Sequence, residues 1–68
     1  MITVLLNNKT QQLGASSSLL DLMQENGLEN KTGIATALNG SIIPKSRWSE
    51  TLLNTNDKIL VITATQGG

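Results

Sequence analysis

The chain contains 68 residues, of which 38% are hydrophobic and 15% are charged, and its formal net charge is zero. This length allows one small domain with a thin core, which we expect to span residues 1–68. The basic residues are scattered, so a nucleic acid or an anionic membrane is a poor candidate partner. Cysteine and histidine are absent, and we therefore expect neither a metal site nor catalytic residues.

No targeting segment is expected. The apolar run over residues 1–6 follows no basic segment and is too short for the core of a signal peptide. No apolar run approaches the ~20 residues that a transmembrane helix requires. The expected location is therefore the cytoplasm.

The first predicted element is a β-hairpin. Ile2, Val4 and Leu6 alternate with other residues, which predicts a strand with one firmly apolar face. A polar turn over residues 7–9 follows, and residues 10–13 can return as the second arm.

A short helix is predicted next. Ser18 can cap its first turn, and Asp21, three residues later, suits the positive end of the helix dipole. Gly27 fits the left-handed position just past a helix end, and Leu28 can fold back over the last turn. The apolar residues recur at i, i+3 and i+4, namely Leu19, Leu22 and Met23.

A second hairpin follows a polar loop. Residues 34–38 predict its first strand, and Asn39-Gly40 is a strong signal for a two-residue turn. Residues 42–43 predict a short second strand, which Pro44 ends because proline has no amide N–H to donate.

The last third of the chain is less regular until its final strand. Residues 46–53 are ambiguous, and we expect a helical turn followed by an extended piece. Residues 54–57 predict a turn, and residues 58–63 predict the last and most apolar strand.

This order of elements has few compact solutions. A lone helix buries its apolar stripe by lying across one face of a small sheet. The first and last strands are the most apolar, which places them side by side and parallel in the centre. We therefore predict an α+β, two-layer β-grasp fold of the ubiquitin-like type, with a mixed sheet of four to five strands and one helix packed across one face.

Because the helix covers one sheet face, the last strand has a covered and an open side. If Ile59 and Val61 face the core, then Leu60 and Ile62 lie on the open face together with Leu5 of the first strand. An exposed apolar patch beside the chain end usually marks a protein-binding surface, so these three residues are the expected partner-binding face. A one-residue slip in register would exchange the two sets.

Three further features allow both a functional and a structural interpretation. Asp21 and Glu25 could form an acid–base pair, but no cleft or partner base is evident and a solvated helix face is favoured. Trp48 could anchor a partner, but a plug at the edge of a thin core is favoured. Lys45 and Arg47 could steer an acidic partner, but ordinary surface charge is favoured.

The sequence ends on Gly67-Gly68. At an average glycine usage of ~7%, chance gives two final glycines about once in two hundred chains, so the pair alone proves nothing. A frayed polar terminus or a cloning remnant is the plain alternative to a functional end.

Three stretches carry a resemblance to a known family: NGSIIPKSRW over residues 39–48, the entry Asp57-Lys58-Ile59 into the last strand, and the final Gly67-Gly68. Together they resemble the ThiS family, the sulfur carrier proteins of thiamine biosynthesis. The resemblance spans essentially the whole chain. NGSIIPKSRW is its most discriminating part, because the wider ubiquitin-like group shares the Gly-Gly end.

The resemblance implies a carrier whose functional atom is the terminal carboxyl of Gly68. In the family, a ThiF-type adenylyltransferase activates this carboxylate with ATP and Mg, and the acyl-adenylate is converted to a thiocarboxylate. Thiazole synthase (ThiG) receives the sulfur, which comes from a donor such as a cysteine desulfurase. Gln66 and Gly67 would enter the partner's active site within a flexible tail at about 64–68. The chain itself would bind no cofactor and would not be an enzyme.

Other functions share these features. A MoaD-like carrier for molybdenum cofactor synthesis, or a carrier for another sulfur pathway, also ends in Gly-Gly. A passive β-grasp interaction module, or a ubiquitin-like modifier that forms amide bonds to lysines, would need no sulfur chemistry. The IIPKSRW stretch and the short length favour the thiamine carrier, and an independent small enzyme is least favoured.

Overall fold

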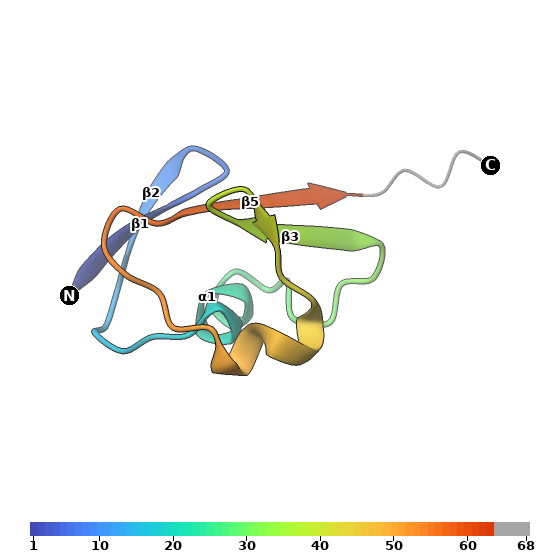
Figure 1. Cartoon of the computed structure of the whole chain (residues 1–68), viewed down its shortest axis with the longest axis horizontal. Helices are drawn as coiled ribbons and strands as arrows, with labels where there is room; N and C mark the ends of the chain where they lie inside the picture. Colours follow the sequence, from blue (N-terminus) through green and yellow to red (C-terminus); the bar gives the residue numbers. More distant parts are fainter. Residues whose placement is uncertain (64–68) are drawn as a thin grey trace.

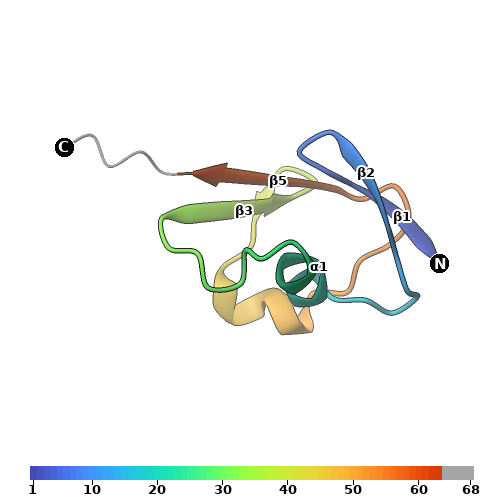
Figure 2. The ribbon, with the colours of Figure 1, turned by 180° about the vertical axis from the view of Figure 1, so that it is seen from behind.

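A computed structural model describes residues 1–63, and the predicted tail at 64–68 lies outside the described residues. The elements in chain order are β1 (Ile2–Leu6), β2 (Lys9–Leu13), α1 (Leu19–Glu25), β3 (Ile34–Leu38), β4 (Ser41–Ile42), the 3-10 helix η1 (Lys45–Glu50) and β5 (Lys58–Thr63). Figures 1 and 2 show both helices on the same side of the sheet. Within residues 1–63, no helix lies on the other side of the sheet.

The five strands form one mixed sheet in the order β2-β1-β5-β3-β4. β1 and β5 run parallel in the middle of the sheet, whereas every other pair of neighbours is antiparallel. The predicted placement of the first and last strands is therefore confirmed. The predicted two-layer arrangement, with one α-helix across one sheet face, is confirmed as well.

The core lies between the sheet and the helices. Val4 and Leu6 of β1 are buried on the face that the sequence alternation predicted. Leu19, Leu22 and Met23 of α1 are each 0% exposed and Leu20 is half-buried, so the predicted apolar stripe of the helix faces the sheet. The buried cluster comprises Val4, Leu6, Leu13, Leu19, Leu22, Met23, Trp48, Leu53 and Ile59.

Both ends of α1 are fixed by local hydrogen bonds. The Ser18 Oγ accepts from the Asp21 amide at 3.1 Å, and an Asp21 carboxylate oxygen accepts from the Ser18 amide at 2.8 Å, which completes a capping box. At the other end Gly27 has φ 71°, and the Leu28 amide donates to the Met23 carbonyl at 2.8 Å. This pairing is a Schellman motif, so both predicted helix ends are confirmed.

The turns of the two hairpins determine the strand bounds. Asn7 and Asn8 both have positive φ, at 49° and 69°, and form a two-residue turn. β2 therefore begins at Lys9, one residue before the predicted bound. In the second hairpin Asn39 and Gly40 also have positive φ, at 49° and 89°, as the predicted type I′ turn requires.

The segment around η1 closes the core on one side. Trp48 is 3% exposed, and its indole Nε1 donates to the Ile43 carbonyl at 3.0 Å. Its structural interpretation is thus confirmed. The strand predicted at 42–43 covers Ser41–Ile42 instead, although the Ile43 amide still donates to the Thr36 carbonyl of β3 at 2.8 Å. After η1, the extended piece pairs with the entrance of α1 through an isolated bridge between Ser18 and Leu52.

We expect Ser18→Ala to lower the free energy of unfolding by about 1 kcal/mol, because it removes the side chain that accepts from the Asp21 amide. Glu25→Ala is the matched control in the same helix, and its exposed side chain predicts a change within about 0.5 kcal/mol. Urea denaturation of both variants measures the difference. Equal stabilities of the Ser18→Ala variant and the wild type would contradict the capping role.

Candidate functional site

The uncovered face of β5 presents apolar side chains. Leu60 and Ile62 are each 49% exposed, whereas Ile59 is 2% exposed and Val61 packs against the core. The predicted assignment of the two sides of β5 is therefore confirmed. Leu5 lies opposite Lys58 in the parallel register, which places it on the open face, and it is half-buried.

Neighbouring strands extend this apolar surface. Ala37 of β3 lies opposite both Leu60 and Ile42, and directly opposed residues share a sheet face. Ile42 is 62% exposed, which makes it the most exposed apolar side chain of the group. The open-face patch, as we call it below, comprises Leu5, Ala35, Ala37, Ile42, Leu60 and Ile62.

The sequence analysis did not include Ile42 in the partner-binding face. A signal for it was available in the two-residue turn at Asn39-Gly40. Such a turn places Leu38 opposite Ser41, and it therefore places Ala37 opposite Ile42. The register of the hairpin would have identified the missing member of the open-face patch.

A hollow of about 380 Å³ lies within this face and is lined by residues of β1, β3 and β5 and of the turns that follow β1 and β3. Leu5, Ala37 and Leu60 supply apolar lining, and Asn7 and Asn39 supply amide groups. A cavity of about 150 Å³ can hold a benzene molecule, so this hollow can receive an apolar side chain of a partner. Apolar lining beside a few polar groups is typical of a specific binding site.

Two asparagines hold β5 from opposite sides. β3 ends before Asn39, whose amide donates to the Lys58 carbonyl at 2.8 Å and whose Oδ1 accepts from the Lys58 amide at 2.9 Å. β1 ends before Asn7, whose amide donates to the Ile59 carbonyl at 2.9 Å and whose Oδ1 accepts from the Val61 amide at 2.8 Å. In both cases a side-chain carbonyl bonds to β5 where the backbone has turned away into a hairpin.

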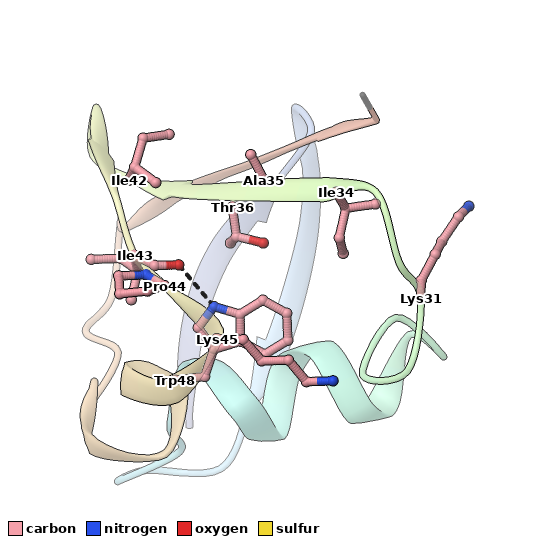
Figure 3. Close-up of a pocket in the computed structure, with 9 residues that line it drawn as sticks. All are labelled: Lys31, Ile34, Ala35, Thr36, Ile42, Ile43, Pro44, Lys45 and Trp48. Carbon is pink, nitrogen blue, oxygen red and sulfur yellow. Dashed lines mark hydrogen bonds between the residues drawn. The ribbon is translucent and has the colours of Figure 1, made fainter. Parts of the chain in front are cut away.

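A second, smaller hollow of about 190 Å³ lies at the edge of β3 beyond the short strand β4. Figure 3 shows Thr36 pointing from β3 toward the indole of Trp48, with Ile43 and Pro44 on the segment that leads from β4 to η1. Thr36 is 1% exposed, and its Oγ1 has no hydrogen-bond partner among residues 1–63. Among the described residues, Lys31 and Lys45 are the ionisable side chains of the lining, so that part of the chain offers this hollow no carboxylate or thiol for catalysis.

The remaining predicted site residues fall into two groups. The carboxylate of Asp21 accepts from the Ser18 amide, Lys45 lines the smaller hollow, and Glu25 and Arg47 are exposed. The predicted tail residues Gln66, Gly67 and Gly68 lie outside the described residues. Over the described residues 1–63, no three His, Cys, Asp or Glu side chains gather where a metal ion could bind. The same part of the chain has no helix long and apolar enough to cross a membrane.

Comparison with known proteins gives a consistent set of relatives. The model of the ThiS family matches residues 4–68. The sulfur carrier protein ThiS of Escherichia coli (strain K12) is 26% identical over 65 residues, which make up 96% of this chain and 97% of that protein.

Solved structures show the same fold. The crystal structure of the thiamine biosynthesis protein ThiS from Geobacter metallireducens matches with a TM-score of 0.82 at 16% identity, and the match covers 98% of this chain and 100% of that chain. The solution structure of a thiamine biosynthesis protein from the same organism matches with a TM-score of 0.74 at 16% identity, over 98% of this chain and 88% of that chain. These matches confirm the predicted β-grasp fold.

We expect Thr36→Val to raise the free energy of unfolding by about 1 kcal/mol, because valine keeps the branched shape and removes a buried hydroxyl that has no partner. Thr51→Val is the matched control, since the Thr51 hydroxyl donates to the Arg47 carbonyl at 2.7 Å and its loss should lower stability. Thermal denaturation compares the two variants. Destabilisation by Thr36→Val would mean that a buried water satisfies the hydroxyl in solution.

Proposed function

The chain belongs to the ThiS family, and from this membership we propose that it is the sulfur carrier protein of thiamine biosynthesis, the pathway that builds the thiazole ring. The observation that carries the proposal is the family match over residues 4–68, which includes the final Gly67-Gly68. The name of the Escherichia coli relative, a sulfur carrier protein, supports it. We propose that residues 1–68 form one carrier domain.

The proposed chemistry takes place at the carboxylate of Gly68. A carboxylate is a poor acylating group, because its leaving group would be oxide. A ThiF-type adenylyltransferase would use ATP and Mg to convert it to an acyl-adenylate, from which AMP can leave. The terminal sulfur of a persulfide on a donor such as a cysteine desulfurase would then displace AMP and form an acyl disulfide. A thiol reductant would cleave that disulfide and release the thiocarboxylate, which thiazole synthase (ThiG) would consume.

The sequence composition suits a co-substrate better than a catalyst. The chain has no cysteine or histidine that could serve as an activated nucleophile or a general base. All catalytic groups would therefore belong to the partner enzymes. Gly67 and Gly68 lack a Cβ atom, which would allow the chain end, with Gln66, to enter a narrow active-site channel.

The open-face patch is the proposed docking surface for these enzymes. Leu60, Ile62 and Leu5 lie on the strand pair from which the chain continues to Gly68, so docking here would bring the carboxylate to the partner. Ile42 and the adjoining hollow enlarge this surface and give a partner side chain a place to insert. An exposed apolar patch of this kind usually marks a protein-binding surface.

A MoaD-like carrier and a passive β-grasp interaction module are the main competing functions. Both could present an apolar sheet face, so the face does not separate them from a thiamine carrier. Incubation with a ThiF-type enzyme separates a passive module from a sulfur carrier, because a passive module would not be adenylated. A MoaD-like carrier would give its sulfur to a different acceptor than thiazole synthase.

We expect the intact mass of the wild-type chain to rise by the exchange of one oxygen for sulfur after incubation with ATP, a ThiF-type enzyme and a sulfur source. Fragment-ion mapping should place the change at Gly68. Gly68→Ala, or deletion of Gly68, should abolish the mass change and leave the circular dichroism spectrum unchanged. Thiocarboxylate formation at wild-type level in either variant would contradict the role of Gly68.

We expect Leu60→Glu to change stability by about 0.5 kcal/mol or less, because the side chain is half exposed on the uncovered face. The same variant should weaken binding to the ThiF-type enzyme about tenfold or more, as measured by calorimetric titration. Ile59→Glu is the matched control on the opposite side of β5, and it should unfold the chain because Ile59 is 2% exposed. Unfolding of the Leu60→Glu variant would show that the two sides of β5 are exchanged.

A further inference from the structure

Asn7 lies where β1 stops following β5. The two strands pair through only two opposed positions, Leu5 with Lys58 and Leu6 with Ile59. At Asn7 the backbone enters the left-handed region, with φ 49°, and turns into the first hairpin. The next backbone carbonyl after β1, that of Asn7, is thereby turned away from β5.

The side chain of Asn7 takes the place of that carbonyl. In a parallel ladder, one residue bonds through its N–H and its C=O to the two residues that flank its partner on the next strand. Here the Asn7 amide donates to the Ile59 carbonyl at 2.9 Å, and the Asn7 Oδ1 accepts from the Val61 amide at 2.8 Å. The pairing of β5 on this side therefore extends to Val61 although β1 has ended.

We infer that Asn7 is a positioning residue, which fixes the direction in which β5 delivers the chain end to a partner enzyme. The inference rests on the proposed function of Gly68. Val61 is two residues before Thr63, the last described residue, so its amide bond is the contact on the β1 side nearest to the chain end. Without Asn7 Oδ1, the last hydrogen bond on this side of β5 would be the one at the Ile59 carbonyl.

The other asparagine that bonds to β5 acts at a different place. Asn39 bonds to Lys58 at the start of β5, and it also donates from Nδ2 to an Asp57 carboxylate oxygen at 3.0 Å. Its contacts hold the entry of the strand, whereas the Asn7 contact holds the part that leads to the chain end. On the opposite side β3 pairs with β5 as far as Thr63, so loss of the Asn7 side chain would loosen β5 without detaching it.

The test replaces Asn7 by glycine, which tolerates the positive φ and removes the side-chain acceptor. Asn56→Gly is the matched control, because Asn56 also has a positive φ, at 74°, in the turn that precedes β5, and its bond to β1 uses only its backbone amide. Asn7→Asp is the rescue variant, since a carboxylate oxygen can accept from the Val61 amide. The first readout is amide hydrogen exchange of Val61 relative to Leu60, which needs no enzyme.

Loss of one hydrogen bond predicts that exchange at Val61 rises about five-fold relative to Leu60 in the Asn7→Gly variant. The ratio should stay at the wild-type value in the Asn56→Gly and Asn7→Asp variants. A wild-type ratio in the Asn7→Gly variant would overturn the inference.

The second readout is steady-state conversion of each variant by a ThiF-type enzyme with ATP. Misdirection of the chain end should lower kcat on the order of tenfold in the Asn7→Gly variant. KM should change by a smaller factor than kcat, because the apolar residues of the open-face patch remain although the Asn7 amide lines the adjoining hollow. Asn7→Asp should recover most of kcat, and Asn56→Gly should match the wild type. An unchanged kcat in the Asn7→Gly variant would overturn the positioning role.

The two readouts separate this inference from the proposed function. If the wild-type chain is not converted at all, the proposed function fails, and with it the role of Asn7 in the transfer. If the wild-type chain is converted but the Asn7→Gly variant is converted equally well, the proposed function stands and the inference fails.

Discussion

The parallel pairing of β1 with β5 is the contact on which the rest of the structure depends, because it joins the first and last strands in the middle of the sheet. Its ladder is short, with two opposed pairs, yet it is reinforced at both ends. On one side the turn over residues 54–57 bonds to β1, with the Asn56 amide donating to the Thr3 carbonyl at 2.8 Å. On the other side Asn7 continues the ladder to Val61. Closure of so long a loop is entropically costly, so these reinforcing bonds add to a pairing that the chain entropy opposes.

The sheet built around this central pair has two different faces. One face packs against the helices, and the other is exposed and available for binding. One side of the sheet receives α1 and η1, and nearly all of the buried cluster comes from these contacts. On the other side Ile42, Leu60 and Ile62 are exposed, since no element of the described chain covers them (Figures 1 and 2). A small domain cannot bury both faces of a sheet with one short helix, and the open-face patch is the result of that shortage.

The parts of the fold that were predictable from the sequence are those determined by interactions between residues close together in the chain. The Ser18 cap, the glycine after α1 and the Asn39-Gly40 turn each act within a few residues, and each was predicted. The bonds of Asn7 to Val61 and of Trp48 to Ile43 were not predicted, because a side-chain amide or indole gives no sign in the sequence of the backbone group it will meet. The candidate site divides in the same way. Alternation along β5 identified Leu60 and Ile62, whereas Ile42 required the register of a neighbouring strand.

The outer strands of the sheet bear on self-association. β2 carries Lys9 and the polar run Thr10-Gln11-Gln12, and β4 has two residues and is followed closely by Pro44. Charged, short and proline-terminated edges are the features by which sheet proteins discourage edge-to-edge pairing with their own copies. Because both edge strands are protected in this way, the protein can expose an apolar face at high concentration with less risk that its copies pair edge to edge into fibrils. The sheet can then offer its apolar surface to other proteins while remaining a poor template for itself.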